Sequence, residues 1–263
     1  MTQDASTAVG VHRTDPDASG VGIVEIRRGA ETYVTAQVLR AVLAELRVLD
    51  DDPGCGAIVV RSAGKHFCAG RDWRAVREPE DTAAAIYETA PGLLSCGTPW
   101  IARLTGGSIG VGMGLALCAD YRIAADSAYF WPRFVAIGIH HGFGLSATLP
   151  WLVGPQRATE MLSTGRKVSM PEALTTGLVD RVAPLDRLDA EVAAFAAHLA
   201  AQPRAALQAI KQTMRADLRV AFASAIVREQ EQQGELYESE DFRRETGGGY
   251  RYRTEGAQSE ESE

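Results

Sequence analysis

Short apolar segments that alternate with helical segments are the feature that most constrains this fold. Four of them have the length and composition of buried strands: VGIVEI (21–26), AIVVR (57–61), WIARL (100–104) and YRIAA (121–125). Between the first two, residues 35–49 have apolar side chains at helical spacing, and Thr35 is a suitable N-cap. The alternation continues to about residue 185 and predicts an α/β fold with a largely parallel sheet.

The pattern changes after residue 185, where helical segments follow one another without a strand. Three such segments are expected: 188–201, 203–218 and 220–236. Polar or glycine-rich stretches at both ends of the chain are typical of flexible tails. These differences predict four regions: a flexible tail over 1–18, a core over 19–200, a helical C-terminal module over 201–245 and a second flexible tail over 246–263.

Charge and cysteine content exclude several classes of protein. The formal net charge is -7 and there is no basic run, which argues against nucleic acid or an anionic membrane as the main partner. There is no apolar run near the ~20 residues that span a bilayer, and no signal-peptide pattern. The four cysteines lack metal-ligand spacing and are expected to be buried free thiols in a reducing compartment, with no metal site. We therefore expect a cytoplasmic enzyme or binding domain.

Two glycine-containing loops follow predicted strands. They are HFCAGRD (66–72) and GVGMGLALCAD (110–120), and the second opens a predicted helix. Such loops place backbone N–H groups at the carboxyl ends of neighbouring strands, where ligands of α/β sheets bind. Helix N-termini favour negative charge, and two N–H groups that point at one atom form an oxyanion hole. The spacing differs from GxGxxG, so a dinucleotide site is not expected.

Together and in this order, the two loops resemble the crotonase (enoyl-CoA hydratase/isomerase) superfamily, and the resemblance covers nearly the whole chain except its ends. It implies a crotonase-like spiral of ββα units, followed by a helical module through which members assemble as trimers or dimers of trimers. It also implies an acyl-CoA or acyl-carrier thioester as partner, with coenzyme A as part of the substrate and no separate cofactor.

The resemblance also implies which residues form the site. The backbone N–H groups of Arg71 and Val111 would hold the enolate oxygen. Residues expected to contact coenzyme A are Arg28, Ala69, Asp72 and Lys211. Residues expected to line the acyl pocket are Trp73, Gly114, Phe134 and Phe143, with Trp131 as a further aromatic side chain. This pocket would be aromatic and poor in carboxylates, which suits a bulky or aromatic acyl group.

The sequence departs from the superfamily pattern at its acid/base positions. Hydratases of this superfamily carry two glutamates, where this chain has Gly114 and Phe134. The neighbouring Arg133 cannot act as a base, because a guanidinium stays protonated. Related 4-chlorobenzoyl-CoA dehalogenases need an aspartate where this chain has Gly142. Methylmalonyl-CoA decarboxylases carry a tyrosine about where His141 falls, paired with a histidine in the place of Arg71. The departures argue against simple hydration and against dehalogenation.

The segment GIHHGFG (138–144) offers replacement acid/base groups. A histidine with a pKa near 6.5 can take or give a proton at neutral pH, and we expect His141 to do so, with His140 as the less favoured candidate. In an extended chain the two side chains point to opposite sides, so at most one enters the pocket. Tyr87 is the next candidate, as a phenol that donates a proton or orients the substrate.

These residues predict an acyl-thioester enzyme with non-hydratase chemistry, such as decarboxylation or C–C cleavage. Both reactions depend strongly on enolate stabilisation and little on a strong base. One alternative is a hydratase or isomerase that recruits an acid/base group from elsewhere, such as Glu88 or a residue of the C-terminal helices. The other is a catalytically silent acyl-CoA-binding protein.

Overall fold

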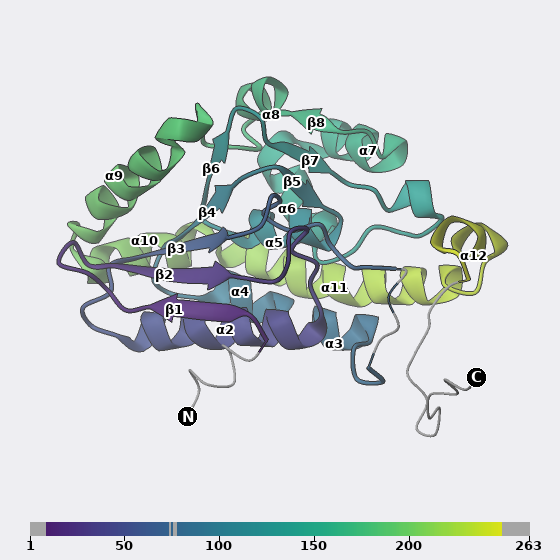
Figure 1. Cartoon of the computed structure of the whole chain (residues 1–263), viewed down its shortest axis with the longest axis horizontal. Helices are drawn as coiled ribbons and strands as arrows, with labels where there is room; N and C mark the ends of the chain where they lie inside the picture. Colours follow the sequence, from purple (N-terminus) through teal and green to yellow (C-terminus); the bar gives the residue numbers. More distant parts are fainter. Residues whose placement is uncertain (1–8, 74, 76–77, 249–263) are drawn as a thin grey trace, which may run out of the picture.

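The computed structural model describes residues 9–73, 75 and 78–248, and a six-stranded sheet lies at its centre (Figure 1). The strand order is β1-β2-β3-β4-β6-β9, in which β1 pairs antiparallel with β2 and the remaining pairs are parallel. The bounds are β1 (Val11–Thr14), β2 (Val21–Ile26), β3 (Ala57–Ser62), β4 (Trp100–Leu104), β6 (Tyr121–Ala125) and β9 (Arg181–Ala183). The four predicted strands and the parallel sheet are confirmed.

A smaller sheet of very short strands has the order β5-β7-β8. Its bounds are β5 (Gly107–Ile109), β7 (Tyr129–Trp131) and β8 (Val168–Ser169). The chain passes from β4 to β5 and then into helix α5 (Val111–Cys118), and from β6 to β7 and then toward the next helix. Each passage is one strand of the large sheet, one of the small sheet and a helix, as expected for a spiral of ββα units.

Helices cover both sides of the large sheet (Figure 1). Helix α2 packs against β1 and β2, and α9 packs against β3 and β6 from the other side. Thr35 caps α2 as expected, because its hydroxyl accepts a hydrogen bond from the Val38 N–H at 3.3 Å. The remaining bounds are α2 (Ala36–Asp51), α3 (Ala83–Tyr87), α4 (Ala90–Ser95), η1 (Val135–Ile137), α6 (Leu145–Val153), α7 (Pro155–Thr164), α8 (Met170–Thr176), η2 (Leu185–Arg187) and α9 (Leu188–Ala200).

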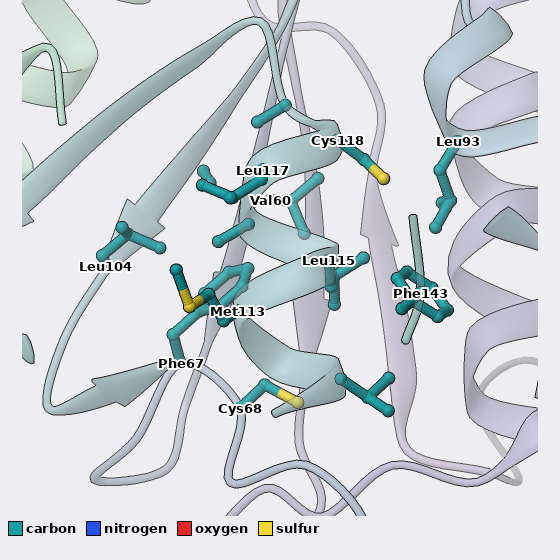
Figure 2. Packing of buried hydrophobic residues seen from close by; sticks show 14 of the residues in the cluster. Val60, Phe67, Cys68, Leu93, Leu104, Met113, Leu115, Leu117, Cys118 and Phe143 are labelled. Carbon is teal, nitrogen blue, oxygen red and sulfur yellow. The ribbon is translucent and has the colours of Figure 1, made fainter. Parts of the chain in front are cut away.

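Helix α5 is buried on all sides. Its residues Met113, Leu115 and Leu117 pack against strand, loop and helix side chains around it (Figure 2). A helix that is apolar all round is typical of the centre of a core. The core therefore holds α5 in a fixed direction, with its N-terminus at the carboxyl ends of β3 and β4.

Two predictions about the ends of the chain need correction. Residues 11–14 belong to β1 rather than to a flexible tail, because their backbone pairs with β2. The C-terminal module contains α10 (Arg204–Met214), α11 (Ala216–Leu236) and α12 (Glu240–Thr246), so the segment predicted over 203–218 breaks at Arg215. At Arg215 the backbone has φ -107 and ψ 6, which interrupts the helix. The predicted tails over 1–8 and 249–263 lie outside the described residues.

Two expectations about side chains and membranes can be compared with this structure. The four cysteines are buried free thiols, and burial raises the pKa of Cys68, Cys96 and Cys118 to about 12. Within the described residues, no helix combines the length and the apolar character needed to cross a bilayer.

Candidate functional site

Two loops at the carboxyl ends of β3 and β4 form the floor of the candidate site. We call residues 66–72 the first loop and residues 105–111 the second loop; most of the glycine-containing stretch 110–120 belongs to α5. They pair through the backbone of Cys68, whose N–H donates to the Gly107 carbonyl at 3.2 Å and whose carbonyl accepts from the Ile109 N–H at 2.9 Å. The two loops therefore hold each other in place.

Two glycines allow this close approach. Gly70 has φ +79, and a Cβ there would lie 2.7 Å from the Ile109 carbonyl oxygen and 3.8 Å from the Val111 nitrogen. A Cβ on Gly112 would lie 2.2 Å from the Cys68 carbonyl oxygen. A larger side chain at either position would push the loops apart.

The residues predicted to donate N–H groups meet at one cavity. It has a volume of about 340 Å³, and Arg71 and Val111 both line it; we call it the central cavity. Val111 is the first residue of α5, so its N–H has no acceptor within the helix. The helix dipole adds partial positive charge at this end. Together these features favour a ligand oxygen that carries negative charge.

The Arg71 side chain anchors the first loop. Its guanidinium donates to the Asp81 carbonyl at 2.6 Å and to the Asp81 carboxylate at 3.1 Å. The other oxygen of that carboxylate accepts from the Ala36 N–H at 2.7 Å, at the start of α2. This buried chain of hydrogen bonds fixes the backbone of Arg71 relative to α2.

Aromatic side chains line much of the central cavity. Trp73 and Phe134 are among them, as predicted, and so are Trp131, Tyr33 and Tyr129. The Phe134 ring covers the second loop, since its Cζ lies 3.7 Å from the place a Cβ of Gly110 would take. Aromatic rings therefore line the same cavity as Arg71 and Val111.

Carboxylates also line the central cavity, and the expectation that the pocket is poor in them needs correction. Glu31, Asp72 and Glu245 are lining residues. Glu31 forms an ion pair with Lys65, whose hydrogen bond lowers the pKa of Glu31, and its carboxylate also lies 3.3 Å from the His66 ring nitrogen Nε2. Within the described ranges, no three His, Cys, Asp or Glu side chains are arranged to hold a metal ion.

Helix α12 supplies one wall of the central cavity. Glu245 and Thr246 at its end are lining residues. The helix contacts η1, and its Phe242 ring packs edge-on against Trp73 with ring centroids 5.2 Å apart. The helix that carries Glu245 is thus held beside the first loop by apolar packing.

The two histidines are arranged differently from the prediction. Their rings stack, with centroids 4.0 Å apart, so they do not point to opposite sides. The segment is not a strand, and a ring nitrogen of His140 lies 2.6 Å from the His141 carbonyl oxygen. Among the described residues that line the central cavity, neither histidine appears.

His141 is engaged elsewhere. Its Nε2 lies 2.8 Å from the Ser146 hydroxyl oxygen. Burial, with a smaller contribution from His140, lowers the pKa of His141 to about 4. His141 is therefore uncharged at neutral pH, and its placement contradicts the prediction that it enters the pocket.

Tyr87, Gly114 and Phe143 also lie outside the lining of the central cavity. Tyr87 is 3% exposed, and its hydroxyl donates to the Gln233 side-chain oxygen at 2.9 Å. Phe143 fills the space beside Gly114, since a Cβ there would lie 2.8 Å from the Phe143 Cβ. These three predicted site residues belong to a packed layer between α3, α5 and α11.

The residues predicted to bind coenzyme A are separated by the fold. Ala69 and Asp72 line the central cavity. Arg28 and Asp72 line an adjoining cavity of about 410 Å³, which shares Arg71 with the central cavity and which we call the side cavity. These three residues stay candidates for coenzyme A.

Lys211 lies at the opposite edge of the sheet. Its ammonium donates to the Asp120 carboxylate at 2.7 Å and to the Thr98 carbonyl at 3.1 Å, where the chain enters β6 and β4. The side chain is buried and paired with Asp120. The prediction that Lys211 contacts a coenzyme A phosphate is therefore wrong.

Glu31 and Glu245 were missed by the sequence analysis. Glu31 follows β2, at the same edge of the sheet as the two loops, so its position in the topology could have indicated it. Glu245 has no comparable signal, because the packing of α12 against Trp73 and η1 brings it to the cavity.

Comparison with known proteins places this arrangement in a family. Residues 17–258 match the family model described as enoyl-CoA hydratase/isomerase. A "probable enoyl-CoA hydratase" of Mycobacterium tuberculosis is 39% identical over 195 residues, which cover 72% of this chain and 74% of that protein. Another "probable enoyl-CoA hydratase", from Mycobacterium bovis, is 32% identical over 226 residues, which cover 84% of each.

Solved structures show the same likeness. The crystal structure of an enoyl-CoA hydratase from Mycobacterium avium subsp. paratuberculosis superposes with a TM-score of 0.82 at 27% identity and covers 90% of this chain and 94% of that one. A structure titled as a probable enoyl-CoA hydratase from Mycobacterium thermoresistibile has a TM-score of 0.75 at 29% identity and covers 86% and 98%. The paired loops, the spiral of ββα units and these matches establish that the chain belongs to the enoyl-CoA hydratase/isomerase family.

Proposed function

We propose that this protein binds an acyl thioester in the central cavity and stabilises its enolate with the N–H groups of Arg71 and Val111. The thioester carbonyl would lie between the first and second loops, with coenzyme A in the side cavity that shares Arg71. Two preorganised donors, of which Val111 lies at a helix N-terminus, strengthen their hydrogen bonds as charge moves onto the oxygen. The enolate is thereby stabilised more than the bound substrate, which lowers the barrier to its formation.

The reaction we propose is decarboxylation or C–C cleavage of an acyl group with a carbonyl at its β position. For C–C cleavage, water first adds to the β carbonyl carbon, so that the departing fragment leaves as a carboxylic acid. In both reactions the bond between the α carbon and the departing carbon then breaks, and its electron pair forms the enolate. A proton then adds to the α carbon. For decarboxylation the departing fragment is carbon dioxide, and no base is needed to start the reaction. The donors of the two loops therefore supply the main stabilisation.

The observation that carries this proposal is the loss of space at one glutamate position of hydratases. A Cβ on Gly114 would lie 2.8 Å from the Phe143 Cβ, so the present packing leaves no room there for a glutamate side chain. At the other position stands Phe134, whose ring covers the second loop. A water molecule held between two carboxylates has no counterpart at these positions.

A hydratase or isomerase with a relocated carboxylate is the second candidate, and Glu245 favours it. This residue of a C-terminal helix lines the central cavity. Glu88 does not favour it, because its side chain is 69% exposed, lies 3.6 Å from Arg40 and is absent from the cavity lining. The two candidates therefore differ in whether Glu245 is required.

Mass spectrometry of the protein incubated with crotonyl-CoA, a β-ketoacyl-CoA and methylmalonyl-CoA tests the proposal. Loss of carbon dioxide or cleavage of the ketoacyl chain, with crotonyl-CoA unchanged, is the expected result. Addition of water to crotonyl-CoA that is lost in Glu245→Gln would establish the second candidate instead. Thioester binding without turnover of any substrate would indicate a catalytically silent binding protein.

We also propose that the chain assembles into homotrimers or dimers of trimers through α10 and α11. Ile210 and Met214 on α10 are 59% and 66% exposed, and Val220 and Val227 on α11 are 71% and 55% exposed. Large apolar side chains on adjoining helices are typical of a surface that another chain covers. Sedimentation equilibrium is expected to give three or six chains per particle, and a single chain would contradict this assembly.

A further inference from the structure

Two cations share one aromatic ring at the edge of the central cavity. The Arg133 guanidinium carbon lies 4.8 Å from the centre of the Trp131 ring, and the Lys167 ammonium lies 4.7 Å from it. Lys167 is also 4.7 Å from the Tyr129 ring. Trp131 is oriented in turn by its indole N–H, which donates to the Gly165 carbonyl at 2.8 Å. The ring faces attract both cations and keep them close together.

Neither cation has a carboxylate partner in the part of the chain that the structure describes. The adjacent Arg166 contrasts with Lys167, because it binds the carboxylates of both Glu160 and Glu172. Two like charges near one ring repel each other, and their combined field attracts an anion. Both side chains are exposed, so a ligand reaches them without a change in the fold.

These cations lie beside the proposed thioester site. Trp131, Tyr129 and Arg133 line the central cavity together with Val111 and Phe134. A ligand whose thioester carbonyl meets the Val111 N–H therefore has part of its length near Trp131. A guanidinium presents a planar set of donors that matches a carboxylate or a phosphate, and an ammonium adds a point charge.

We propose that Arg133 and Lys167, held on Trp131, bind an anionic oxygen group of the thioester ligand. The group is a carboxylate at the far end of the acyl chain, because the proposed function places coenzyme A in the side cavity. This inference rests on the proposed function, because it assumes a thioester in the central cavity. It adds a second recognition point beyond the two N–H groups.

Calorimetric binding of four ligands to the full chain tests this assignment. The ligands are butyryl-CoA, glutaryl-CoA and the matching butyryl and glutaryl thioesters of pantetheine, which lack the phosphates. Arg133→Met and Lys167→Met remove one charge each and keep much of the side-chain length. Arg157→Met is the matched control, because Arg157 is exposed on α7 and does not line the central cavity.

Removal of either charge is expected to raise the dissociation constant of the ligands that carry the recognised anion roughly tenfold, as for loss of a charge-assisted hydrogen bond. Weaker binding of both glutaryl thioesters alone identifies an acyl carboxylate. Weaker binding of both coenzyme A thioesters alone would identify a phosphate of coenzyme A instead and would overturn the acyl-carboxylate assignment. Arg133→Lys is expected to restore part of the affinity, and Arg157→Met to bind like the wild type.

Other outcomes overturn the inference in distinguishable ways. If the wild type binds the coenzyme A thioesters and the two variants bind all ligands equally well, the anion site is wrong and the proposed function stands. If the wild type binds none of the four ligands, the proposed function fails and the anion site fails with it. Circular dichroism and thermal unfolding of each variant establish that the fold is intact.

Discussion

The two paired loops and the histidine segment, residues 138–146, both contain glycines and histidine, but the polar groups of the two regions have different partners. The second loop ends at Val111, which is the first residue of α5 and lines the central cavity. The Val111 N–H therefore has no acceptor within the helix. In the histidine segment, the Gly144 and Ser146 N–H groups both donate to the Glu229 carboxylate at 2.7 Å. The Gln233 amide likewise donates to the His140 carbonyl at 2.6 Å.

This difference shows that residue type alone does not locate chemistry. The histidine segment has groups that commonly transfer protons, but its partners lie within the protein and tie the segment to α11. The first loop also carries His66 and Asp72, but the proposed function rests on the backbone: close packing at Gly70 and Gly112 holds Arg71 and Val111, and both line the central cavity. A binding site requires polar groups that have no hydrogen-bond partner within the protein and can therefore bond to a ligand.

Val111→Pro is expected to have the largest effect on turnover. Proline lacks the N–H, and it is tolerated at the first position of a helix, so the change removes the donor while α5 can still form. Loss of one oxyanion-hole donor lowers kcat roughly 100-fold or more. Steady-state kinetics on the substrate found by mass spectrometry measures this effect. An unchanged kcat in a folded Val111→Pro protein would show that this N–H does not act.

Gly112→Ala is expected to destabilise the loop pair by about 3 kcal/mol, because the new Cβ would lie 2.2 Å from the Cys68 carbonyl oxygen. Gly234→Ala on α11 is the matched control, since nothing lies within 4 Å of a Cβ there. In a helix interior this change is expected to stabilise by about 0.5–1 kcal/mol. Urea unfolding measures both values, and equal stability of the two variants would contradict the close approach of the loops.

The pH dependence of stability separates the histidine segment from the loops. Because the pKa of His141 is lowered to about 4 from 6.5, the unfolded chain binds this proton more readily than the folded chain. The stabilising contribution is present above pH 6.5 and is lost as pH falls toward 4. Between pH 7 and pH 5, the free energy of unfolding of the wild type, measured with urea, is expected to fall by up to about 2 kcal/mol more than that of His141→Gln. An identical pH dependence would contradict a buried, uncharged His141.

Tyr87→Phe is expected to have the smallest effect. The change removes the hydrogen bond to the Gln233 oxygen, which also accepts from the Tyr237 hydroxyl at 2.5 Å. The free energy of unfolding is therefore expected to fall by about 1 kcal/mol, with kcat unchanged. Thermal unfolding and steady-state kinetics on the same preparation test both statements. A large fall in kcat with little loss of stability would return Tyr87 to the catalytic site.

The sequence predicted four strands of the large sheet and the two glycine-containing loops, because both depend on local patterns. Apolar runs such as 57–61 have strand length, and the glycines of the two loops follow strand ends. Superfamily resemblance then selected Arg71 and Val111, and both line one cavity. The short strands β1, β5, β7, β8 and β9 were not predicted, because two to four residues carry too weak a periodic signal.

The side-chain part of the site depended on long-range packing and was predicted less well. His141 and Tyr87 were expected in the pocket. Instead, Gln233 of α11 accepts a hydrogen bond from the Tyr87 hydroxyl, and Glu229 of α11 accepts from the backbone N–H groups near His141. Glu245 reaches the cavity only because α12 packs against Trp73. No pattern within residues 138–144 indicates what the distant helix α11 places beside them.

Infrared spectroscopy of bound butyryl-CoA, labelled with ¹³C at the thioester carbonyl, tests the central claim most directly. Hydrogen bonds from the Arg71 and Val111 N–H groups would polarise the carbonyl, so its stretching band is expected at lower frequency when bound than when free in water. Val111→Pro is expected to lose much of that shift while still binding the ligand. A bound carbonyl with the frequency of free butyryl-CoA would contradict the claim that the two loops form an oxyanion hole.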